Sequence, residues 1–124
     1  MIEQILAWLR NLGLSDMEAE HLGPREGDMG LFCRGREVLW ERQDILGGKL
    51  CRQRLVFLVD IRGRTLEILE AGMILEPMLR LTAPYFGEDQ KILLENGRTV
   101  KDNGSGIPVK EYKLTVEYTT KEEA

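Results

Sequence analysis

Apolar residues recur with two different periods along this chain, and the change of period divides it into elements. Near the N-terminus large apolar residues return every three or four positions, at Ile2, Ile5, Leu6, Leu9 and Leu12. This spacing puts them on one face and predicts an amphipathic helix over residues 2–12. Gly13 follows directly and favours the end of the helix there, because glycine adopts left-handed backbone conformations without a steric penalty.

A second, shorter helix is predicted to follow. Ser15 and Glu18 have the three-residue spacing of a capping box, which favours the start of a helix. The sequence HLGP, beginning at His21, favours its end. We therefore predict a helix over residues 16–22. His21 is the only histidine, and the pattern gives it no catalytic partner, so we interpret it as an exposed or satisfied residue near the helix end.

From Gly30 onward the pattern becomes extended. Residues 30–63 are rich in Val, Leu, Ile, Phe and Trp, and Gly47-Gly48 separates two extended runs, which predicts a β-hairpin or a β-meander. Residues 55–61, LVFLVDI, are apolar at both odd and even positions until Asp60. Such a run is typical of a central strand that is covered on both faces. We expect it to be the least exposed strand.

Residues 65–84 return to helical spacing. Apolar side chains lie near that spacing at Leu66, Leu69, Met73, Pro77, Leu79 and Leu81. We expect a helix packed on the sheet, with its methionines filling the core. Pro77 lacks an N–H donor and clashes with the preceding turn, so the pattern predicts either a kinked helix or two helical pieces.

The C-terminal third predicts further strands. Asn96-Gly97 lies between extended runs and is a strong hairpin signal. Alternation in residues 111–118, with Tyr112 and Tyr118 on the apolar side, predicts a strand that is buried on one face. The whole chain, residues 1–124, is thus expected to form one small α+β domain. Its mainly antiparallel sheet of about four to five strands carries the N-terminal helix and the central helix.

Composition narrows the functional classes. Hydrophobic residues make up 43% of the chain and charged residues 31%, as in ordinary globular proteins. No run approaches the roughly 18 consecutive apolar residues of a membrane span, and the N-terminus lacks the basic region of a secretory signal. We expect synthesis in the cytosol, where Cys33 and Cys51 are reduced.

Charge is distributed unevenly along the chain. The net charge is -4, yet residues 31–64 hold eight basic and four acidic side chains. Three interpretations remain open for this middle third: a solvated face of mixed charge, a surface complementary to another protein, and a nucleic-acid interface. The four basic residues that we select here as candidate contacts are Arg42, Lys49, Arg52 and Arg54.

One segment resembles a nucleotide-binding motif. Residues 102–107, DNGSGI, are similar to the adenine-contacting box of the GHKL ATPases. That family also needs an upstream helix with a magnesium-binding asparagine and a later glycine-rich lid. Asn11 is the only asparagine before residue 96, and only 18 residues follow Gly106. We interpret the segment as a turn between antiparallel strands and expect no ATP binding and no other cofactor.

Other catalytic and metal-binding motifs are missing from the sequence. It contains no P-loop, G-x-S-x-G, H-E-x-x-H or C-x-x-C pattern and no zinc-binding constellation. We therefore predict that the protein is not an enzyme.

A wider resemblance covers nearly the whole chain. It is carried by GLFCRGREVLWERQDILGGKLCRQRLVFLV, LEAGMILEPM and APYFGEDQKILLENGRTVKDNGSGIPVKEYKLTVEY, in that order. The combination resembles the small tail-terminator and head–tail joining proteins, often labelled minor capsid proteins, of siphophages and prophages of Gram-positive bacteria. The matching features include residues 52–57 (RQRLVF), residues 69–72 (LEAG) with Glu76, and the pair Tyr112 and Tyr118.

The resemblance implies an assembly function without catalysis. Such proteins form a homo-oligomeric ring, typically a hexamer, that caps the tail tube and offers its other face to the head connector. The expected partners are thus further copies of the chain, the tail tube protein and the connector. The implied location is the bacterial cytoplasm during assembly and then the head–tail junction of the virion.

Candidate contacts for such a ring lie in residues 44–51 and 102–108. In the second segment the candidates are Asp102, Asn103 and Ser105, which join the four basic residues selected above. The alternative function is a small nucleic-acid-binding module that uses the arginine-rich middle third. The implied assembly function itself requires neither a membrane nor direct contact with nucleic acid.

Overall fold

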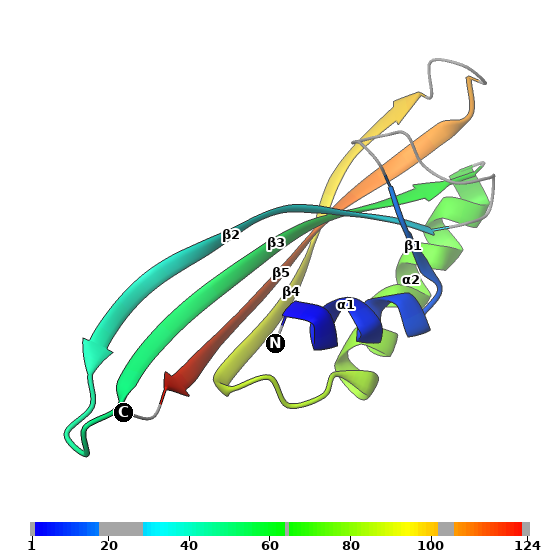
Figure 1. The fold of residues 1–124 in the computed structure, drawn as a ribbon. Coiled ribbons are helices and arrows are strands. Elements are labelled where there is room, and N and C mark those ends of the chain that lie inside the picture. The colour runs from blue at the N-terminus through cyan, green and yellow to red at the C-terminus, as the bar shows by residue number, and fades with distance from the viewer. Residues whose placement is uncertain (1, 18–28, 64, 102–105, 123–124) are drawn as a thin grey trace.

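The computed structural model is a curved five-stranded sheet with two helices against one face (Figure 1). It describes residues 2–17, 29–63, 65–101 and 106–122. In chain order the elements are α1 (Ile2–Asn11), β1 (Leu14–Asp16), β2 (Met29–Gln43), β3 (Lys49–Arg62), α2 (Thr65–Thr82), β4 (Glu88–Lys101) and β5 (Pro108–Glu122).

The strands follow the order β1-β2-β3-β5-β4 across the sheet. Among the described strands, the short β1 pairs in parallel with the start of β2, and the other neighbouring strands pair antiparallel. This arrangement confirms the predicted α+β class, the mainly antiparallel sheet and the two helices. It also places β3, which contains the apolar run 55–61, in the centre.

The core lies between the helices and one face of the sheet. On β3 the alternate residues Leu55, Phe57, Val59 and Ile61 face it, and on β5 Tyr112, Leu114, Val116 and Tyr118 do. α1 and α2 are joined at the edge of this core, because the indole Nε1 of Trp8 donates a hydrogen bond to Thr82 Oγ1 at 2.9 Å. On the opposite face of β3 Leu58 and Asp60 are buried as well, whereas Val56 is half-buried, so the predicted cover on both faces holds for residues 58–61 but not for the whole run.

Two predicted glycine signals are confirmed by backbone geometry. Gly13 has φ +97° and its N–H donates to the carbonyl of Arg10, which ends α1. Gly47 has φ +93° in the turn between β2 and β3. That turn is closed by the N–H of Asp44, which donates to the carbonyl of Gly48 at 2.7 Å.

The predicted second helix is wrong at its start. Ser15 and Asp16 belong to β1, and the N–H of Met17 donates to the carbonyl of Leu31. Pairing with β2 and burial of Leu14 therefore decide the conformation here, in place of the local capping pattern. The remainder of the predicted helix, residues 18–22 with His21, lies outside the described residues.

α2 is a single helix that continues through Pro77, so the predicted alternative of two separate pieces is wrong. Its sheet-facing residues are Ile68, Leu75 and Leu79, with Gly72 lying against the end of the Tyr112 side chain. The side chains that the helical spacing selected are more than half exposed at Leu66, Leu69, Met73 and Leu81. The helix is apolar on both faces, and Met73 does not fill the core as predicted.

The predicted hairpin at Asn96-Gly97 is also wrong. β4 continues through both residues, and its register with β5 shifts between Asn96 and Thr99. A Cβ atom on Gly97 would lie 2.4 Å from the carbonyl oxygen of Glu111, so glycine is needed for the close approach of two strands. β4 ends at Lys101 and β5 begins at Pro108. Residues 102–105 of the DNGSGI segment, which we interpreted as a turn, lie outside the described residues.

We predict that Gly97→Ala lowers the free energy of unfolding by about 1–3 kcal/mol, because the added methyl group must displace the backbone of β5. Gly35→Ala is the matched control: Gly35 lies at the register shift of β2, and an added Cβ there meets no atom within 4 Å. Urea denaturation of both variants measures the difference. Equal stability of the two would contradict the strand assignment at Gly97.

Candidate functional site

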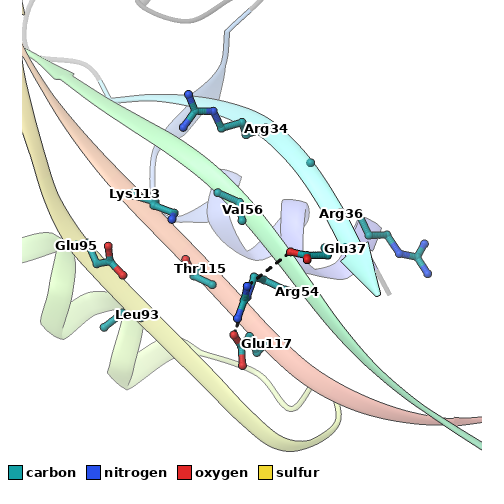
Figure 2. Close-up of a pocket in the computed structure, with 11 residues that line it drawn as sticks. Arg34, Arg36, Glu37, Arg54, Val56, Leu93, Glu95, Lys113, Thr115 and Glu117 are labelled. Atoms are coloured by element: carbon teal, nitrogen blue, oxygen red, sulfur yellow. Dashed lines mark hydrogen bonds and ion pairs between the residues drawn. The ribbon is translucent and has the colours of Figure 1, made fainter. Parts of the chain in front are cut away.

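The face of the sheet that points away from the helices contains a shallow groove of about 510 Å³ (Figure 2). Its walls come from β2, β3, β5 and β4 and are mostly polar. They include Arg34, Arg36, Glu37, Arg54, Val56, Leu93, Glu95, Lys113, Thr115 and Glu117. Both acidic and basic side chains line the groove, so it carries no single charge sign.

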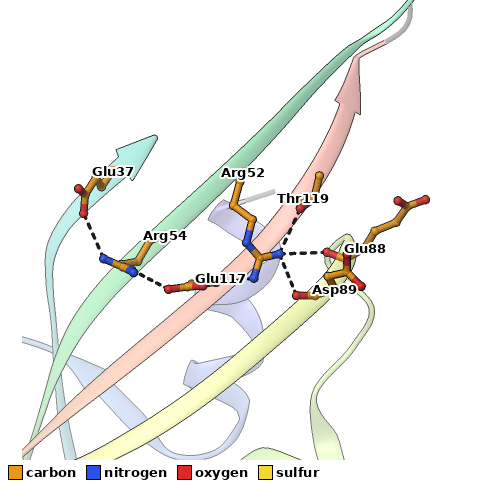
Figure 3. A network of polar contacts seen from close by, with 7 residues as sticks. All are labelled: Glu37, Arg52, Arg54, Glu88, Asp89, Glu117 and Thr119. Carbon is orange, nitrogen blue, oxygen red and sulfur yellow. Dashed lines mark hydrogen bonds and ion pairs between the residues drawn. The ribbon is translucent and has the colours of Figure 1, made fainter. Parts of the chain in front are cut away.

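Arg52 on β3 makes polar contacts with β4 and β5 beside the groove (Figure 3). The register of β4 against β5 shifts between Glu88 and Lys91, and Asp89 takes φ 50° there. The guanidinium group of Arg52 donates to the carbonyl oxygens of Asp89 at 2.8 Å and of Glu88 at 3.5 Å. It therefore satisfies carbonyl groups at the irregular start of the edge strand, where regular pairing is interrupted.

The same guanidinium group also reaches β5. It donates to Thr119 Oγ1 at 3.1 Å and to the carboxylate of Glu117 at 3.2 Å. Arg52 is only 8% exposed. The Arg52 side chain therefore links β3 to β4 and β5. Its positive charge is balanced by the Glu117 carboxylate, and its N–H groups donate to acceptors on both strands.

Glu117 is shared by two arginines. Its second carboxylate oxygen accepts a hydrogen bond from Arg54 Nε at 2.7 Å, and Arg54 lies 3.6 Å from Glu37 on the other side. The hydrogen bond from Arg54, followed by that from Arg52, lowers the pKa of Glu117 below its ordinary value of 4.5, against the opposing effect of burial. The chain Glu37–Arg54–Glu117–Arg52 is thus charge-balanced and links β2, β3 and β5.

The predicted contact residues separate into three groups. Arg52 and Arg54 come together in the network, and Arg52 presents little surface to a partner. Arg42 and Lys49 lie beside the β2–β3 turn, where Arg42 stacks over Trp40 at 4.9 Å and Lys49 pairs with Glu41 at 3.1 Å. Asp102, Asn103 and Ser105 lie outside the described residues.

The predicted contact segment 44–51 contains two strongly exposed apolar side chains that the sequence pattern did not single out. Ile45 at the tip of the β2–β3 hairpin is 100% exposed, and its neighbour Leu46 is 86% exposed. The signal was present, since two large aliphatic residues precede Gly47-Gly48 in a segment where turns are normally polar. The outer face of α2 is the second such surface.

Neither cysteine is positioned for a bridge within one chain. Cys33 pairs with Phe57 and Cys51 with Glu41 in the same antiparallel ladder. They are therefore separated by about six strand residues, roughly 20 Å. This is well beyond disulfide geometry. Among residues 2–17, 29–63, 65–101 and 106–122, no cluster of three His, Cys, Asp or Glu side chains is arranged to hold a metal ion.

Comparison with known protein families and with curated proteins finds no match to this chain. In the part of the chain that the structure describes, neither helix combines the length and the apolar character needed to cross a membrane.

We predict that Arg52→Met lowers the free energy of unfolding by about 3 kcal/mol, because the Glu117 carboxylate and the carbonyls of Glu88 and Asp89 lose a shared partner. Arg42→Met removes an exposed arginine from the same hairpin and should change stability by less than about 0.5 kcal/mol. Urea denaturation distinguishes the two. A similar small effect of both variants would show that Arg52 does not hold the strands together.

Glu117→Gln should make stability less dependent on pH. Since the folded-state pKa of Glu117 is lowered, its ionised form stabilises the fold above the ordinary value of 4.5, and this contribution is lost as the pH falls through the folded-state pKa. The variant should therefore be less stable than the wild type at about pH 7, with the difference shrinking towards about pH 3. Denaturation curves across this range provide the measurement, and a constant difference would contradict the assignment.

Proposed function

We propose that the protein is a non-enzymatic virion assembly protein, a tail terminator or head–tail joining component that caps a phage tail tube as a homo-oligomeric ring. The resemblance of the sequence to that family motivates the proposal. The structural observation that carries it is the presence of two exposed apolar surfaces, the tip of the β2–β3 hairpin and the outer face of α2.

The exposed apolar side chains of these two surfaces favour binding to another protein. The outer face of α2 presents Leu66, Leu69, Met73 and Leu81 along one helix, and the hairpin tip adds Ile45 and Leu46. Apolar groups that cluster on a surface lose contact with water when another protein covers them, and such patches commonly mark interaction sites. A ring of identical chains supplies that cover by repetition of one contact.

The sheet offers further places for assembly at its edges. Among the described strands, β4 pairs only with β5, and β2 pairs with β1 only at Met29–Leu31. The remaining edges leave backbone donors and acceptors that can pair with another chain. In the proposed function these edges serve contacts with the tail tube protein and the head connector.

The alternative, a nucleic-acid-binding module, receives less support from the same geometry. Arg52 and Arg54 are directed at Glu117, and the groove beside them also contains Glu37 and Glu95. Phosphate binding depends on cations that are available to release counterions. Here two central arginines are instead engaged with carboxylates in the sheet.

Assembly is tested by sedimentation velocity over a concentration series, together with negative-stain microscopy of the protein mixed with purified tail tubes. We predict weak association of the protein alone and closed rings, six-fold by analogy with the family, at high concentration or on tube ends. A protein that stays monomeric at about 1 mM and leaves tube ends bare would refute the proposal. Steeply salt-dependent binding of DNA would instead support the alternative.

A further inference from the structure

We propose that the β2–β3 hairpin tip of one copy inserts into an apolar hollow beside α2 of the next copy. This inference rests on the proposed ring for its biological setting. The contact itself is argued from the shapes, charges and positions of the two surfaces, which we call the tip (Ile45 and Leu46) and the hollow (Met29, Ala71, Ile74, Leu75 and Met78).

The tip is an apolar protrusion on an ordered turn. Asp44 holds the turn through its N–H bond to the Gly48 carbonyl and through an ion pair of 2.9 Å with Lys121 at the end of β5. Ile45 and Leu46 lie between Asp44 and Gly47 in this turn, and both side chains are almost fully exposed. Because the turn is already fixed, docking of the tip costs little conformational entropy.

The hollow has a matching chemical character. It measures about 180 Å³ and is lined by Met29 at the start of β2 and by Ala71, Ile74, Leu75 and Met78 of α2. All five side chains are apolar, and methionines adapt readily to the shape of an inserted group. The hollow is therefore suited to an aliphatic side chain and offers no side-chain hydrogen-bonding group to a polar one.

A chain cannot fill its own hollow with its own tip. Met29 is the first residue of β2, and the tip follows its last residue, Gln43. A strand of this length spans roughly 45 Å, and Figure 1 shows the β2–β3 turn and the start of β2 at opposite ends of the sheet. The contact is consequently between molecules and joins two different surfaces, which is the type of contact that generates rings when its rotation closes.

Charge near the two surfaces favours the same pairing. Arg42 is exposed two residues before Asp44, next to the tip. Glu70 is exposed on α2 one turn before Ile74 of the hollow. Opposite charges around an apolar contact orient the partners as they approach, and they disfavour tip-to-tip association because that would bring two copies of Arg42 together.

Cysteine cross-linking tests the contact directly. In a Cys33→Ser background, one preparation carries Leu46→Cys and the other Ile74→Cys. Leu93→Cys replaces Ile74→Cys in the control, since Leu93 is 52% and Ile74 57% exposed, but Leu93 lies on the helix-free face. After mild oxidation we expect the Leu46→Cys and Ile74→Cys pair to give about tenfold more mixed dimer than the control pair. Equal yields, or a majority of dimers between two Leu46→Cys chains, would overturn the proposal.

A substitution series separates this contact from the ring proposal. Leu46→Asp should lower the association constant about tenfold in sedimentation velocity, whereas Tyr85→Asp, at a residue that is 73% exposed outside both surfaces, should leave it nearly unchanged. Circular dichroism checks that both variants fold. If Leu46→Asp forms rings as readily as the wild type, the contact is wrong and the ring proposal stands. If the selective cross-link forms but the wild type never closes into rings or caps tubes, the contact stands and the ring proposal fails.

Discussion

The pairing of β3 with both of its neighbours is the interaction on which the other elements depend. Its residues Lys49–Arg62 pair along the strand with β2 on one side and β5 on the other. Because side chains alternate between faces, this one strand places Leu55, Phe57 and Val59 against the helices and Arg52 and Arg54 on the opposite face. The apolar core and the charged groove are therefore two consequences of one register, and a shift by a single residue would exchange them.

The edge strand β4 is held against β5 and β3 by different interactions along its length. Regular pairing with β5 is interrupted near Glu88–Lys91 and again near Asn96–Thr99. At the first irregularity Arg52 reaches from β3 to the carbonyls of β4, and at the second Gly97 permits close contact with the backbone at Glu111. The arginine thus supplies donors to carbonyl groups where regular pairing is interrupted, whereas the glycine leaves the space that the close approach of the two backbones requires.

Sequence periodicity predicted the elements well where one face of each is buried, as in α1 and the Tyr112–Tyr118 stretch of β5. It failed where pairing with residues distant in sequence determines the backbone conformation. Ser15 and Asp16 pair with β2, although their local pattern favours a helix cap, and Asn96-Gly97 lies within a strand because β5 passes beside it. α2 carries apolar residues on its exposed face as well as on its buried face, so spacing alone could not tell its sheet-facing residues from its exposed ones. The partners of Arg52 likewise come from two strands, β4 and β5, that lie far from it in sequence, and no local pattern reveals them.

The separation of exposed apolar groups to opposite ends of the sheet has a physical consequence for association. The tip cannot cover the hollow of its own chain, because β2 holds the two surfaces apart along its length. Each surface is also small, and the net charge of -4 makes copies repel one another weakly in solution. Such a chain gains little from a single contact, whereas closure of a ring or attachment to a template satisfies contacts at both ends together and raises the effective concentration of each partner. We therefore expect the proposed self-association to be weak in isolation and cooperative on a template.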